Sequence, residues 1–165
     1  MAITFQNQEL KFTLKNKLRI KSWIKHVIKS EKKEEGNINF VFTSDTKILE
    51  TNIQFLNHNT YTDIITFDDC EGRIIHGDII ISVERVSENA LKYGAAFEYE
   101  LHRVMIHGVL HLCGYKDKSK ADVALMRKKE DQALKKFDYW PNVFDEEELS
   151  LLIFLKLKVM GYDVL

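Results

Sequence analysis

The sequence predicts a single α+β domain, with a small mixed β-sheet of about four strands and helices packed on it. A length of 165 residues, of which 45% are hydrophobic and 30% charged, suits one globular domain with a continuous core. Strand patterns are concentrated in the first half of the chain and helical patterns in the second. This order favours α+β over a regularly alternating α/β fold.

The chain begins with an expected strand, helix and strand. Residues 3–5 could form an edge strand, and residues 38–43 alternate apolar side chains with period two. Between them, apolar residues recur at near-helical spacing through residues 14–28, and Gly36-Asn37 is predicted to stop this amphipathic helix.

A second helix and a hairpin are predicted next. Ser44 or Asp45 is a plausible N-cap for a helix that reaches residue 56. The β-rich runs 64–67 and 74–81 flank the polar segment 68–72, which suits a hairpin loop, so we expect these two strands to be antiparallel.

The second half of the chain is predicted to be helical. One helix should span residues 83–93 and end at Gly94, because glycine readily adopts the left-handed conformation of a C-terminal cap. Two more helices are expected at about residues 97–112 and 120–137.

The composition changes at residue 138, which predicts a main domain over residues 1–137 and a C-terminal extension over 138–165. Leu149 to Met160 is apolar but too short to span a bilayer. It could be a packed terminal helix, an oligomer contact or a partly disordered tail. The first residues lack a secretory signal pattern, so a cytoplasmic location is expected, with no membrane partner.

The net charge of −1 does not by itself indicate a nucleic-acid partner. Basic residues are nevertheless concentrated between Lys11 and Lys33, where Glu31 is the only acid. Such a helix face could simply be solvated, or it could contact phosphates, and the composition leaves both interpretations open.

A candidate metal site occupies the stretch from His107 to Asp117. His107 and His111 are four residues apart and therefore lie on one helix face, one turn apart. Gly114 can end that helix and turn the chain so that Asp117 approaches the same point. Three protein ligands leave a tetrahedral zinc ion one open position, as in catalytic sites, so one Zn²⁺ per chain is predicted.

The segment HGVLHLCGYKD resembles the signature HGxLHLxGYDH of the YbeY family of endoribonucleases and rRNA-maturation factors. TDIITF at residues 62–67 and GDI at residues 77–79 are similar to two further family segments in the same order. The resemblance implies the family's central sheet with packed helices, and metal-dependent hydrolysis of RNA phosphodiester bonds in rRNA maturation and ribosome quality control.

Departures from the family pattern affect both the expected site and the end of the chain. Asp117 stands in place of the third family histidine, and Leu56 stands where the family usually has an arginine. His58 falls where the family often has lysine, so His58 and Lys116 are candidates to stabilise charge on a phosphate, although His58 could equally be an exposed loop residue. The chain beyond residue 138 has no family counterpart.

By the same resemblance, Asp78 stands at the position of an acidic residue that lies near the site in the family, where it could orient a ligand or a water molecule. An Asp at a strand end could instead cap a turn.

A zinc-dependent, single-strand-type endoribonuclease is therefore the expected function. Its expected partners are rRNA of the small ribosomal subunit and ribosome-associated proteins, with no DNA. One alternative is a metal-stabilised ribosome- or RNA-binding assembly factor with little catalysis, which Leu56 favours. Another is a different metal hydrolase such as a peptidase, which is disfavoured because Gly108 occupies the position of the glutamate base in HExxH enzymes.

Overall fold

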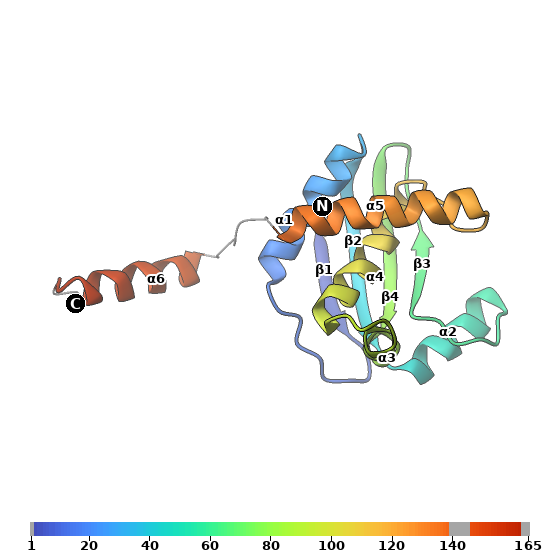
Figure 1. Ribbon diagram of the computed structural model, residues 1–165, viewed down its shortest axis with the longest axis horizontal. Helices are drawn as coiled ribbons and strands as arrows, with labels where there is room; N and C mark the ends of the chain where they lie inside the picture. The colour runs from blue at the N-terminus through green and yellow to red at the C-terminus, as the bar shows by residue number, and fades with distance from the viewer. Residues whose placement is uncertain (1, 139–145, 163–165) are drawn as a thin grey trace.

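The computed structural model describes residues 2–138 and 146–162, and it confirms a four-stranded mixed sheet with packed helices (Figure 1). The strands are β1 (Ile3–Asn7), β2 (Glu34–Thr43), β3 (Ile64–Asp68) and β4 (Ile74–Ser82). The helices are α1 (Lys17–Ser30), α2 (Asp45–Leu56), α3 (Val83–Tyr93), α4 (Phe97–Leu112), α5 (Lys120–Asp138) and α6 (Glu146–Val159).

The sheet order is β1-β2-β4-β3. β1 pairs with β2 and β2 with β4 in parallel, whereas β3 and β4 are antiparallel, as expected for the hairpin. Both expected caps of the helices beside this sheet are present: the Ser44 side chain accepts from the backbone N–H of Lys47, and Gly94 has φ 65° at the end of α3.

The prediction that Gly36-Asn37 stops the first helix was wrong. α1 already ends at Ser30, and β2 starts at Glu34, so both residues lie within a strand. A register irregularity between Glu35 and Ile38 interrupts the pairing with β4. A Cβ on Gly36 would meet the carbonyl oxygen of Ile75 at 2.4 Å, so the glycine is required by close strand approach rather than by a helix end.

The hydrophobic core lies between one face of the sheet and helices α1, α4 and α5, which cross in front of it in Figure 1. We call this the inner face. Ile38 and Phe40 of β2 and Ile79 of β4 are fully buried there. The indole N–H of Trp23 in α1 donates to the backbone oxygen of Ala133 in α5 at 2.9 Å, which ties the first helix to the last helix of the domain.

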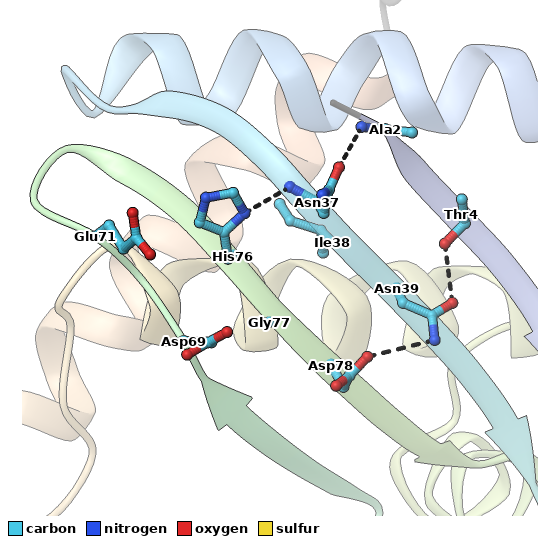
Figure 2. A pocket seen from close by; sticks show the side chains of 10 residues that line it. All are labelled: Ala2, Thr4, Asn37, Ile38, Asn39, Asp69, Glu71, His76, Gly77 and Asp78. Carbon is cyan, nitrogen blue, oxygen red and sulfur yellow. Dashed lines mark hydrogen bonds between the residues drawn. The ribbon is translucent and has the colours of Figure 1, made fainter.

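The opposite, outer face carries polar side chains at the end away from α2. Figure 2 shows Thr4, Asn39 and Asp78 side by side on adjacent strands. Thr4 donates to Asn39 at 2.9 Å, and Asn39 donates to Asp78 at 3.4 Å. Side chains alternate along a strand, so Asp78 points away from the face that its neighbour Ile79 occupies.

α6 lies apart from the sheet and its helices (Figure 1). Its apolar side chains are exposed, including Leu151 at 58% and Val159 at 87%. Of the alternatives left open for this segment, a terminal helix is present, but it does not pack into the core. None of the helices in residues 2–138 and 146–162 is long and apolar enough to cross a bilayer.

Candidate functional site

Helix α4 places His107 and His111 one turn apart on the face that borders a cleft. Their ring centroids are 4.5 Å apart and their planes are inclined at 85°. Gly108 lets this part of the helix approach β4 closely, since a Cβ there would lie 2.8 Å from Cγ2 of Ile79. A glutamate at this position, as in HExxH enzymes, would have no room.

The chain reverses directly after α4, as the sequence predicted. Gly114 has φ 105°, a conformation that glycine adopts without strain, and its N–H donates to the His111 carbonyl at 2.9 Å. This turn returns Asp117 to the two histidines. Its Oδ2 lies 3.2 Å from Nε2 of His111 and 3.5 Å from Nε2 of His107.

Hydrogen bonds at Nδ1 set the orientation of both imidazole rings. Nδ1 of His111 lies 2.9 Å from the carbonyl oxygen of Tyr115, and Nδ1 of His107 lies 3.3 Å from Oε2 of Glu130. A carbonyl and an ionised carboxylate can only accept, so each Nδ1 donates, and in the neutral form of each ring the lone pair is then on Nε2. Both Nε2 atoms face the same carboxylate oxygen of Asp117.

These three groups fit a metal ion. Three lone pairs directed at one place repel each other unless a metal ion or a shared proton lies between them. Ligands at about 2.0–2.1 Å from a tetrahedral zinc ion lie roughly 3.3 Å from one another, and the separations of 3.2 Å and 3.5 Å agree with this spacing. His107, His111 and Asp117 are the group of side chains among the described residues that could hold a metal ion.

Glu130 of α5 contacts His107 at Nδ1, the ring nitrogen that does not face Asp117. Its side chain is only 6% exposed, and its second oxygen, Oε1, accepts from Arg103 at 3.1 Å. Burial alone would raise the pKa of Glu130, but the hydrogen bond and charge of His107 and the contact with Arg103 lower it overall. For His107 burial acts in the other direction and lowers the pKa. The hydrogen bond and charge of Glu130 and the charge of Asp117 more than compensate, so the pKa of His107 is raised.

Two more acids line the same cleft. Burial raises the pKa of Asp63, although the nearby His107 acts in the opposite direction. Burial also raises the pKa of Glu100, against the charge of Arg103. Both carboxyls are therefore easier to protonate than free Asp and Glu side chains.

The cleft has a volume of about 1150 Å³ and brings together most of the residues selected from the sequence. His58 and Lys116 line it together with the three candidate ligands. Leu56, at the position of the family arginine, also lines it and is 43% exposed.

Asp78 is not brought to this cleft. It lines a separate pocket of about 560 Å³ on the outer face of the sheet, together with His76 and Asn39 (Figure 2). The sequence placed it correctly beside Gly77, but the alternation of side chains along β4 turns it away from α4.

Glu130 was missed from the sequence, although a signal for it exists. The buried residues of α5 other than Glu130 are Met126, Ala133, Leu134 and Phe137. Glu130 follows Met126 by four positions and precedes Leu134 by four, so a helical projection places this charge on the buried face. A carboxylate on such a face requires a partner.

Comparisons with known proteins find a family that matches most of the chain. The family model "Endoribonuclease YbeY" matches residues 2–138. A protein of that name from Flavobacterium psychrophilum is 56% identical over 131 residues, which cover 79% of this chain and 94% of the relative. One from Bacteroides thetaiotaomicron is 47% identical over 134 residues, which cover 81% and 98%.

A solved structure gives the same result for the fold. The solution structure of a protein from Thermotoga maritima matches with a TM-score of 0.61 and 27% identity. The match covers 88% of this chain and 97% of the other.

Proposed function

Since this chain belongs to the YbeY endoribonuclease family, we propose that it is a metal-dependent endoribonuclease that cleaves single-stranded RNA at the His107, His111 and Asp117 site. The observation that carries the proposal is the convergence of both Nε2 atoms on Oδ2 of Asp117, at 3.5 Å and 3.2 Å. Three protein ligands in an open cleft leave a position for a substrate or water.

When bound, the metal ion would supply Lewis acidity toward a phosphodiester oxygen and the attacking water. The chain's own residues supply orientation and charge. Glu130 and the Tyr115 carbonyl hold the two imidazoles in the ligand tautomer. Lys116 and His58 line the cleft, where each could stabilise negative charge on the phosphate. Leu56 stands at the position of the family arginine and, being uncharged, cannot fill this role.

We propose zinc as the metal, RNA of the small ribosomal subunit as the substrate, and the cytoplasm as the compartment. Two imidazoles and one carboxylate suit zinc, although the carboxylate also makes the site more tolerant of Mn²⁺. The ribosomal substrate and ribosome-associated partners follow from what the family resemblance implies.

We also propose that residues 1–137 form the catalytic domain and that residues 138–165 are an extension with a separate role. The family match ends at residue 138. The exposed apolar side chains of α6 support this division, because they contribute nothing to the core.

A second function, an RNA- or ribosome-binding factor with little catalysis, is favoured by one observation. Leu56 lines the cleft and removes the positive charge of the usual arginine. Substrate binding could persist without that charge, while transition-state stabilisation would suffer.

Cleavage of a fluorescently labelled single-stranded RNA, measured beside RNA affinity, separates the two functions. His111→Ala should abolish cleavage and leave the affinity nearly unchanged. His76→Ala is the matched control, because His76 lies in the outer-face pocket. If the wild type binds RNA but never cleaves it with Zn²⁺ or Mn²⁺ supplied, the binding-factor function holds instead.

A further inference from the structure

Tyr61 presents an aromatic ring in the cleft that contains the candidate metal site. It belongs to the loop between α2 and β3, and it lines the cleft together with His107 and Lys116. The residue is 56% exposed, so it is accessible to a ligand in the cleft.

Arg85 of α3 supports this ring. Its guanidinium carbon lies 5.1 Å from the centroid of Tyr61, which is within cation–π range. Asp45 fixes the guanidinium through contacts of 2.7 Å and 3.3 Å, and Glu88 adds a third at 3.3 Å. The ring is therefore held against an anchored cation while more than half of the residue stays open to solvent.

The surroundings of Tyr61 suit a nucleic-acid strand. The volume of about 1150 Å³ exceeds the roughly 300–1,000 Å³ of common small-ligand pockets. Lys116, Lys118 and His58 line it and can meet phosphates, and Tyr93 of α3 adds a second aromatic ring that is 66% exposed. Proteins that bind single strands combine aromatic rings for the bases with cations for the backbone.

We propose that Tyr61, supported by Arg85, is a stacking site for an unpaired nucleobase next to the scissile phosphate. This inference rests on the proposed function and adds a residue that contacts a base of the substrate. A base within a duplex has both faces covered by its neighbours, so only a single-stranded or looped nucleotide can stack here. Stacking accepts any base, which predicts weak sequence preference.

The test measures RNA affinity separately from cleavage. Fluorescence anisotropy of a labelled single-stranded oligoribonucleotide is recorded with His111→Ala as the parent, so that the RNA stays intact. Adding Tyr61→Ala should weaken binding about 5- to 150-fold, the range for loss of one base–aromatic stack. Tyr61→Phe should restore affinity to within about twofold, because the phenyl ring still stacks.

Two further variants make the test specific. Tyr61→Leu keeps apolar bulk but has no aromatic face, so it should bind as weakly as Tyr61→Ala. Tyr162→Ala removes a tyrosine of similar exposure, 60%, that does not line the cleft, and it should bind like the parent. In the otherwise wild-type enzyme, Tyr61→Ala should raise KM with little change in kcat, as expected for lost ground-state binding.

An abasic substitution in the RNA then locates the stacked base. At one position near the cleavage site, the abasic RNA should bind the parent more weakly than the intact RNA does. The protein that also carries Tyr61→Ala should bind both RNAs with the same affinity. Unchanged affinity of Tyr61→Ala or full affinity of Tyr61→Leu overturns the stacking site and leaves the nuclease function intact. If neither the wild type nor the parent binds any RNA, both proposals fall.

Discussion

Nδ1 of His107 lies 3.3 Å from Oε2 of Glu130, so a buried carboxylate of α5 orients a candidate metal ligand of α4. Glu130→Gln should weaken zinc binding about 10- to 100-fold, because an amide cannot supply the charge that makes the imidazole a better donor. Competition with a chromophoric chelator measures this affinity directly.

Asp131→Asn is the matched control for that experiment. Asp131 is the next residue and accepts from the same Arg103, at 3.0 Å, but its contact is with Arg103 rather than with His107. Equal losses in the two variants would show that the Arg103 network, and not the contact with His107, controls affinity.

Asp117 is expected to complete the metal site. Asp117→Ala should lower the zinc content of the purified protein from about one ion per chain, since two imidazoles alone bind weakly. Asp117→His restores the family ligand and should retain the metal. Its activity profile should also move to lower pH, because a neutral ligand leaves more positive charge at the site. Elemental analysis and a pH series check both points, and full zinc content in Asp117→Ala would exclude this ligand.

His102 should make the fold sensitive to acid. Burial lowers the pKa of His102 to about 4, from 6.5 for the unfolded side chain. Between these values the unfolded state binds the proton more readily, so this stability is fully present above about pH 6.5 and is lost as the pH falls toward 4. The loss should approach about 3 kcal/mol.

Urea unfolding at several pH values tests this sign. His102 packs against Trp23 and Phe137, with ring centroids 6.1 Å and 4.4 Å away, so His102→Phe can keep the aromatic contacts. The difference between the wild-type and His102→Phe curves isolates the histidine from other titrating groups. A difference that stays constant from pH 7 to pH 4 contradicts the prediction.

Gly108→Ala should destabilise the fold by about 1 kcal/mol. Alanine gains up to about 1 kcal/mol of helix propensity, but overpacking costs about 1–3 kcal/mol. The added Cβ would meet Cγ2 of Ile79 at 2.8 Å. In an Ile79→Ala background only the contact with Cδ1 of Ile64, at 3.0 Å, remains, so Gly108→Ala should cost less there. Chemical unfolding of the four variants measures the coupling.

A chain that ends after Asp138 should keep its unfolding midpoint to within about 2 °C, because α6 lies outside the core. A chain that ends after Lys136 is the control. It loses Phe137, whose ring packs 4.8 Å from that of Trp23 and below the guanidinium of Arg19 at 4.2 Å. Differential scanning fluorimetry should show a clear loss of stability only for the shorter chain.

Local signals predicted much of this fold. The hairpin of β3 and β4 followed from its polar loop, and the α4 turn followed from Gly114, because both depend on residues near in sequence. The order β1-β2-β4-β3 could not be derived in this way, since it depends on packing between distant segments. Gly36 was misinterpreted because a glycine needed for close strand approach looks the same in sequence as one that ends a helix.

The candidate site was predictable to a similar extent. Spacing within one helix and turn was enough to bring His107, His111 and Asp117 together. Glu130 comes from another helix, and its role depends on how α4 and α5 pack. Asp78 was selected by resemblance, which specifies a position along the strand but not the face of the sheet toward which the side chain points.

The attachment of α5 to the rest of the domain also imposes an order on biosynthesis. The carboxylate that orients His107, and the backbone oxygen that anchors Trp23, both belong to the last helix of the domain. While α5 is still inside the ribosomal exit tunnel, a nascent chain has its three candidate ligands but lacks this support. Since domains fold as units once they have emerged, the support of the metal site should be complete only after α5 has left the tunnel.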